Sequence, residues 1–73
     1  MTPRIPPLPF RKVRKLLEAH GFRIVGQRGS HVYFMDAGGR KITVPDHAGK
    51  DIARGLLRSI LDEAGIDPDD VRR

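Results

Sequence analysis

Apolar residues repeat with the period of an α-helix in two segments of this chain, and between these segments they alternate as in β-strands. In the first segment the apolar face consists of Phe10, Val13, Leu16, Leu17 and His20. In the second segment it consists of Ile52, Leu56, Leu57, Ile60, Leu61 and Ala64. The spacing predicts one helix that begins near Pro9 and ends before Gly21, and another that begins near residues 54–56 and ends before Gly65. Such a chain buries its apolar faces by packing two helices on a small sheet.

Three short strands are expected between the helices, at residues 22–27, 31–36 and 40–44. The run Ala37-Gly38-Gly39 predicts a hairpin turn between the second and third strands. Pro45 ends the third strand because it has no N–H to donate, and residues 46–51 are expected to form a loop. The predicted fold class is therefore α+β, a single αβββα domain with two helices packed on one face of a three-stranded antiparallel sheet.

The two ends of the chain are expected to lie outside this domain. Residues 1–9 form a proline-rich lead-in, the domain spans residues 10–66, and residues 67–73 form a short polar tail. Within the tail, Asp67-Pro68 is typical of the start of a short helix. No apolar run is long enough to cross a membrane, and the N-terminus lacks the apolar segment of a signal peptide. We therefore expect a cytoplasmic location without membrane association.

Charge is unevenly distributed along the chain. Residues 1–50 carry ten Lys or Arg and three acidic residues, a net charge of +7, whereas residues 51–73 carry four Arg and six acidic residues, a net charge of −2. A basic region favours a polyanionic partner, although excess charge also keeps a small domain in solution. Without cysteine the chain has neither disulfides nor thiolate metal ligands, and with 73 residues it is too small to enclose a substrate. We expect a surface site that acts on a large substrate.

Alternation along the strands assigns residues to the two faces of the sheet. The apolar residues expected to face the helices are Ile24, Val32, Phe34, Ile42 and Val44. The opposite, open face is expected to display Arg23, Gln27, His31, Tyr33, Lys41 and Thr43. Cations beside a histidine and a tyrosine suit a nucleic-acid backbone and a stacked base. An exposed sheet face is polar in most proteins, however, and tyrosine is a common strand former, so both interpretations stay open.

Four blocks of the sequence resemble, in order, those of HicA-like mRNA interferase toxins. They are Val13-x-x-Leu16-Leu17-x-x-x-Gly21-Phe22, Arg28-Gly29-Ser30-His31-Val32-Tyr33-Phe34, Ile42-Thr43-Val44-Pro45-x-His47 followed by Gly49-Lys50-Asp51-Ile52, and Arg58-Ser59-Ile60-Leu61-x-x-Ala64-Gly65-Ile66. The similarity covers about residues 10–66. It implies a fold like that of double-stranded-RNA-binding domains, ribonuclease activity without a cofactor, and a HicB-like antitoxin partner.

His31 is the predicted catalytic residue. Cleavage of RNA needs a base that takes the 2′-hydroxyl proton and an acid that protonates the leaving oxygen, and an imidazole does either near neutral pH. Nearby cations would stabilise the charge that develops at phosphorus. The predicted RNA-binding residues are Arg28, Lys41, Arg40, Arg23 and Tyr33. From the residues alone, a surface histidine that begins a strand is the simpler interpretation, and the resemblance is what favours catalysis.

The other two histidines are assigned mainly structural roles. His47, in the loop after Pro45, is expected to cap backbone groups, with RNA contact as the alternative. His20 is expected to pack at the end of the first helix and interact with its C-terminus. The histidines lack the spacing of metal ligands even with Asp46 and Asp51 available, so no metal is predicted.

The resemblance thus implies the toxin of a toxin–antitoxin system, an endoribonuclease that binds and cleaves mRNA with His31 as general acid or base. A non-catalytic RNA-binding module on the same fold is the alternative, and it would tolerate loss of His31. A third class is a protein-interaction module whose basic face meets an acidic partner. Salt dependence of RNA binding separates this third class from the others, because phosphate contacts release counterions.

Overall fold

A computed structural model describes residues 5–72 and shows two helices, α1 (Phe10–Ala19) and α2 (Arg54–Ala64), with three main strands between them. These strands are β2 (Arg23–Arg28), β3 (His31–Met35) and β4 (Lys41–Pro45). Two further strands of two residues each, β1 (Leu8–Pro9) and β5 (Asp51–Ile52), pair with each other, and a 3₁₀ helix, η1 (Pro68–Arg72), follows α2. Pro3 of the predicted lead-in and Arg73 of the predicted tail lie outside the described residues.

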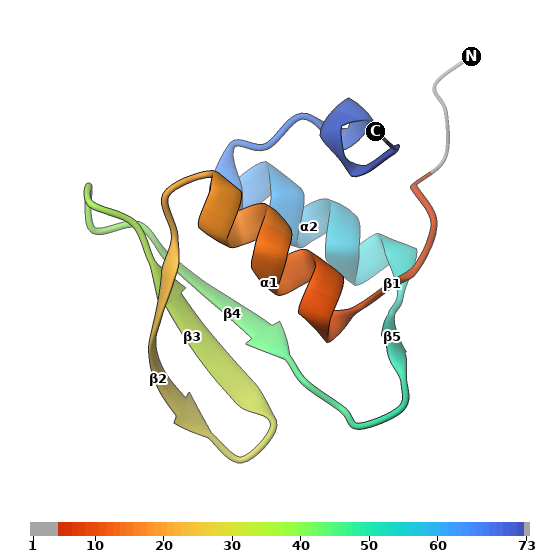
Figure 1. The fold of residues 1–73 in the computed structure, drawn as a ribbon, viewed down its shortest axis with the longest axis horizontal. Helices are drawn as coiled ribbons and strands as arrows, with labels where there is room; N and C mark the ends of the chain where they lie inside the picture. The colour runs from red at the N-terminus through yellow and green to blue at the C-terminus, as the bar shows by residue number, and fades with distance from the viewer. Residues whose placement is uncertain (1–4, 73) are drawn as a thin grey trace.

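The main sheet is antiparallel with strand order β2-β3-β4, and both helices lie on the same side of it (Figure 1). The predicted αβββα arrangement and α+β class are therefore confirmed. The opposite face of the sheet is left uncovered by any element in the described residues. It is this open face that carries most of the predicted site.

A single apolar core joins the helices to the sheet. Its buried members are Ile5, Val13, Leu17, Phe22, Val32, Phe34, Ile42, Val44, Ile52, Leu57, Ile60, Leu61, Ala64 and Ile66. The helical spacing places Val13 and Leu17 of α1 against the strands, and the ring of Phe10 contacts that of Phe34 with 6.2 Å between the centroids. No polar side chain is buried within the described part of the chain. Each polar side chain of the strands is therefore at least partly exposed.

Both helices end in the same pair of backbone hydrogen bonds. At the end of α2, the N–H of Gly65 donates to Asp62 O (3.2 Å) and the N–H of Ile66 donates to Leu61 O (2.9 Å). Gly65 has a φ of 71°, which the left-handed turn of this motif requires and which glycine adopts without strain. α1 ends in the same way at Gly21. The glycines predicted to stop the two helices are confirmed in that role.

The pairing of β1 with β5 was not foreseen. Leu8 pairs with Ile52 and Pro9 with Asp51, so part of the lead-in is tied to the segment before α2, and Ile5 is buried in the core. Ile52 belongs to β5 and not to the second helix. The predicted loop at residues 46–51 is shorter by one residue, because Asp51 belongs to β5. The sequence did not predict β1 and β5, because a strand of two residues shows no alternation of apolar and polar residues.

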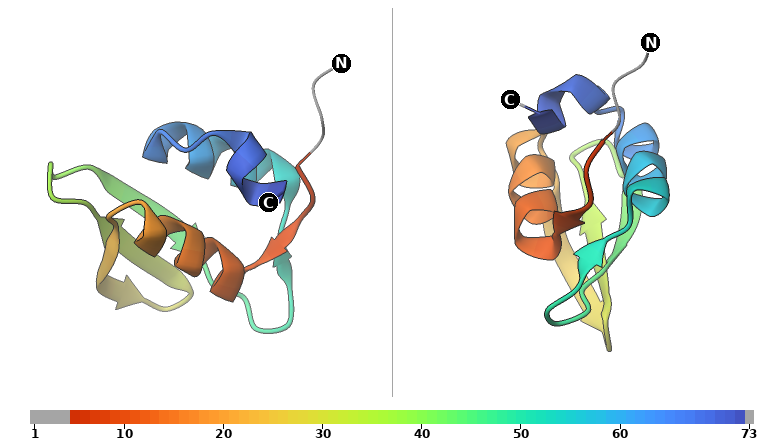
Figure 2. Two further views of the ribbon diagram at one scale, coloured as in Figure 1. Left: turned by 45° about the horizontal axis from the view of Figure 1, so that its top comes forward. Right: turned by 90° about the vertical axis from the view of Figure 1, so that its right-hand side faces the viewer.

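The 3₁₀ helix η1 lies over the helices on the side away from the sheet (Figure 2). The side-chain Oδ1 of Asp67 accepts a hydrogen bond from the N–H of Asp69 at 2.9 Å, which confirms the predicted start of a short helix. His20 links this element to α1: its Nδ1–H donates to Leu16 O at 2.9 Å, and its Nε2 lies 3.5 Å from Asp70 Oδ2. The predicted interaction of His20 with the end of α1 is confirmed.

Candidate nucleic-acid interface and active site

An irregularity in β2 determines which of its residues share a face with His31. Ile24 pairs with Phe34 but Gly26 pairs with Tyr33, so Val25 is an extra residue, a β-bulge. Beyond the bulge the alternation is reversed. Gln27 therefore pairs with the buried Val32, and the prediction that Gln27 faces the open side is wrong. The same reversal brings Arg28 onto the open face.

His31 is the first residue of β3 and is exposed on the open face, between Arg28 of β2 and Pro45 of β4, with which it pairs. The turn before it is held by Gln27, whose Nε2 donates to Gly29 O at 3.1 Å. The pairing of β3 with β4 is prolonged past Pro45, because the N–H of Asp46 donates to Ser30 O at 2.7 Å. Both neighbours of His31 are therefore set by the ladder of the sheet.

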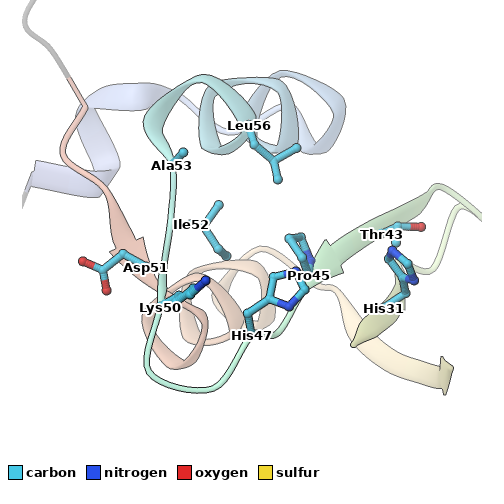
Figure 3. Close-up of a pocket in the computed structure, with 9 residues that line it drawn as sticks. All are labelled: His31, Thr43, Pro45, His47, Lys50, Asp51, Ile52, Ala53 and Leu56. Carbon is cyan, nitrogen blue, oxygen red and sulfur yellow. The ribbon is translucent and has the colours of Figure 1, made fainter. Parts of the chain in front are cut away.

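An open groove of about 410 Å³ adjoins His31 (Figure 3). Its lining consists of His31, Thr43, Pro45, His47, Lys50, Asp51, Ile52, Ala53 and Leu56. In Figure 3 the imidazoles of His31 and His47 lie on either side of Pro45, with Ile52 and Leu56 across the groove, and the carboxylate of Asp51 points away from both rings. Leu56, predicted to lie on the buried face of the second helix, is 45% exposed at this rim.

The segment between β4 and β5 carries two of the groove's polar residues. It turns back on itself through a hydrogen bond from the N–H of Lys50 to His47 O at 3.0 Å. Gly49, inside this turn, has a φ of 75°, a conformation that favours glycine. The turn fixes the backbones of His47 and Lys50 relative to each other and keeps both residues at the groove.

Neither imidazole in the groove is held by a hydrogen bond within the described structure. The side chains of His31 and His47 are exposed, and neither makes a hydrogen bond to residues 5–71. The backbone-capping role expected for His47 is thus not observed. Among the described residues, no three His, Asp or Glu side chains come close enough to hold a metal ion, and no helix is long and apolar enough to cross a membrane.

Two further hollows continue the groove in both directions. One, of about 470 Å³, lies on the open face and is lined by Val25, Gly26, Tyr33, Met35, Lys41 and Thr43. The other is lined by Pro9, Phe10, Arg11, Asp46, His47, Gly49, Lys50 and Asp51. The first shares Thr43 with the groove, and the second shares His47, Lys50 and Asp51 with it. We call this series the track. It runs from Arg11 at the start of α1, past the two histidines, to Tyr33.

The predicted RNA-binding residues are spread along the sheet and do not all gather around His31. Arg28 is its direct neighbour, and Tyr33, which is 36% exposed, lines the hollow on the open face. Arg23 and Lys41 both pair with Met35, at the opposite end of β3.

Arg40 lies elsewhere. Its Nη1 lies 3.0 Å from the position that a Cβ on Gly65 would occupy, so the guanidinium is at the end of α2, where it complements the helix dipole. The cation that lines the groove is Lys50, which the sequence did not single out. A single sequence holds no sign that the loop carrying His47 and Lys50 folds back toward His31.

A three-stranded sheet with two helices on one face, and an open basic face that carries a groove lined by two imidazoles, defines a small α+β domain of the kind seen in double-stranded-RNA-binding folds. The chain belongs to the HicA toxin family of bacterial toxin–antitoxin systems, since the sequence model of that family matches residues 10–66. It is also similar to a probable mRNA interferase HicA of Pseudomonas fluorescens (strain Pf0-1), with 29% identity over 59 residues, which are 81% of this chain and 97% of that protein.

Proposed function

We propose that the chain is an endoribonuclease that cleaves mRNA, with His31 as a general acid or base. The observation that carries the proposal is the position of His31, which is exposed, makes no hydrogen bond to described residues, and lines the central groove of a track of open surface hollows. An open track suits a polymer, whereas small ligands are usually enclosed. Family membership supports the same activity, and so does the name of the relative from Pseudomonas fluorescens.

The RNA would follow the track with its phosphates on cations and a base in the hollow beside Tyr33. Val25, Met35 and the ring of Tyr33 offer apolar surface for a base, and Lys41 lies at the rim of the same hollow. Stacking of a base on an aromatic ring contributes about 1–3 kcal/mol and does not require one particular base. Arg23 and Arg28 add positive charge along β2 on the same face. Arg40 lies at the end of α2 and is not part of this path.

A toxin of a toxin–antitoxin system has an antitoxin partner, and we propose that this partner is a HicB-like protein that covers the His31 face. We place both proteins in the cytoplasm, where mRNA is found. An acidic partner would match the net charge of +7 on residues 1–50 and would exclude RNA from the same surface. Val25 and Leu56, 46% and 45% exposed beside the track, add apolar area of the kind that interfaces bury. A toxin–antitoxin complex that still cleaves RNA at the full rate would contradict this mode of inhibition.

Single-turnover cleavage and RNA binding, measured on His31→Ala and His20→Ala, test the catalytic proposal. We expect His31→Ala to lower the cleavage rate roughly 10²- to 10⁴-fold with little change in RNA affinity. His20 is the matched control, because it is also a partly exposed histidine but is bonded to Leu16 and Asp70 away from the track. Wild-type protein that binds RNA without cleaving it would favour the non-catalytic module. Loss of binding in proportion to cleavage would make His31 a recognition residue.

A further inference from the structure

We infer that His47 is a second catalytic residue, and that His31 and His47 divide the two proton transfers of RNA cleavage between them. This inference rests on the proposed function and deepens it. A single imidazole performs only one of the two transfers in a concerted step, so a second group is needed for the other. The groove supplies a second imidazole beside the first, on a loop whose geometry is set by the sheet.

The strand register explains why the two rings share one surface. Pro45 is the direct partner of His31, and His47 follows two residues later, with the hydrogen bond from Asp46 N–H to Ser30 O continuing the pairing between them. Pro45 faces the same side as its partner His31, and His47 joins both in the lining of the groove, whereas Asp46 lines only the hollow beyond it. His47 itself lies past the end of β4, and Figure 3 shows its ring and that of His31 on either side of Pro45. A phosphodiester bound in the groove would therefore lie between the two imidazoles.

The environment of His47 favours a catalytic role for this residue over a structural role. Its ring is exposed, lines both the groove and the adjoining hollow, and has no hydrogen-bond partner in residues 5–71. Lys50 lines the same two cavities and supplies a positive charge for the non-bridging oxygens of the phosphate. Asp51, the acid that lines the groove, points away from both rings in Figure 3, and Asp46 lines only the adjoining hollow.

The reaction balances with the two histidines alone. One neutral imidazole removes the proton of the 2′-hydroxyl as that oxygen forms a bond to phosphorus. The bond from phosphorus to the 5′-oxygen breaks, and the other histidine, in its imidazolium form, gives that oxygen a proton. The products are a 2′,3′-cyclic phosphate and a 5′-hydroxyl, and the protein ends with one proton moved from one histidine to the other. No water, metal or redox partner enters this step.

A substrate with a sulfur atom in place of the bridging 5′-oxygen separates the two roles, because a thiolate leaves without needing a proton. The test compares His31→Ala, His47→Ala and His20→Ala on an RNA that the wild type cleaves at one site, with oxygen or sulfur at that site. We expect His47→Ala to cleave the oxygen substrate roughly 10²- to 10⁴-fold more slowly while binding it nearly as well. Sulfur should restore the rate of one of the two groove variants, the one lacking the acid, and not of the other. His47→Gln, which keeps a polar side chain of similar reach, should be as slow as His47→Ala.

Several results would overturn the inference. One is cleavage of the oxygen substrate by His47→Ala at the rate of His20→Ala. Others are a loss of affinity as large as the loss of rate, or restoration by sulfur of both groove variants or of neither. If His31→Ala is slow and His47→Ala is not, only this inference fails and the proposed function stands. If the wild type cleaves no RNA, or yields a 5′-phosphate, the two-histidine reaction is wrong, and in the former case the proposed function fails with it.

Discussion

Two regions of this small domain contain the same kinds of side chain in opposite states. At the end of the helix layer, which we call the helix-end region, His20 and Arg40 are engaged: His20 bonds Leu16 O and lies beside Asp70, and Arg40 lies against Gly65 at the end of α2. In the groove, His31, His47 and Lys50 have no side-chain hydrogen bond to the described residues.

The difference shows that residue type alone does not mark a site. A histidine that completes a helix end and contacts a carboxylate already fulfils a structural role. Exposed histidines and a lysine that share a groove, and that bond to no side chain or backbone group among the described residues, are available to a ligand. The comparison therefore predicts that substitutions in the groove lower activity, whereas equivalent substitutions in the helix-end region do not.

The largest difference in cleavage rate is expected between substitutions of the two cations, Lys50 in the groove and Arg40 in the helix-end region. Lys50→Ala should lower single-turnover cleavage roughly 10- to 100-fold, because a charge-assisted hydrogen bond to phosphate is worth about 1.5–3 kcal/mol and each 1.36 kcal/mol is a factor of about ten. The salt dependence of RNA binding should also flatten by about one unit of slope. Arg40→Ala should leave both properties near the wild-type values. Equal losses in the two variants would show that Arg40 reaches the RNA after all.

The next difference is expected between substitutions of two glycines with positive φ, Gly49 beside the groove and Gly65 in the helix-end region. Gly49→Ala and Gly65→Ala should each cost about 1–2 kcal/mol of unfolding free energy, because alanine is strained in the left-handed region. For a domain of this size, each kcal/mol lowers Tm by about 4–8 °C. Only Gly49→Ala should also slow cleavage, since it shifts the turn that carries His47 and Lys50. Thermal unfolding and cleavage measured below Tm check both parts, and normal activity in Gly49→Ala would show that the turn does not position these residues.

The smallest effect concerns the stability contributed by the histidines. His20→Ala should lower the unfolding free energy by about 0.5–1 kcal/mol, because it removes a hydrogen bond to Leu16 O and a partly exposed contact with the Asp70 carboxylate. His31→Ala should change it by less than about 0.5 kcal/mol, as is usual for an exposed side chain. Denaturant unfolding of the two variants measures the difference. A larger loss for His31→Ala would mean that this residue supports the sheet.

Local patterns in the sequence were sufficient for the architecture. The two helices, their glycine ends, the three main strands and most of the core follow from the spacing of apolar residues and from turn chemistry, and the structure confirms them. These features are determined locally, because a helix or strand must match its own period to bury one face. The sequence also predicted the exposed position of His31 at the start of a strand. Its catalytic role, which rests on the resemblance of the Gly29-Ser30-His31 block, stays a prediction.

Tertiary structure alone decided which residues meet at the groove. The bulge at Val25 exchanged Gln27 for Arg28 on the open face, and the turn at Gly49 brought His47 and Lys50 beside His31. Leu56 was exposed at the rim, and Arg40 was carried to the end of α2. None of this follows from local periodicity, because one extra residue in a strand, or one loop that folds back, changes long-range neighbours without changing the pattern that defines each element.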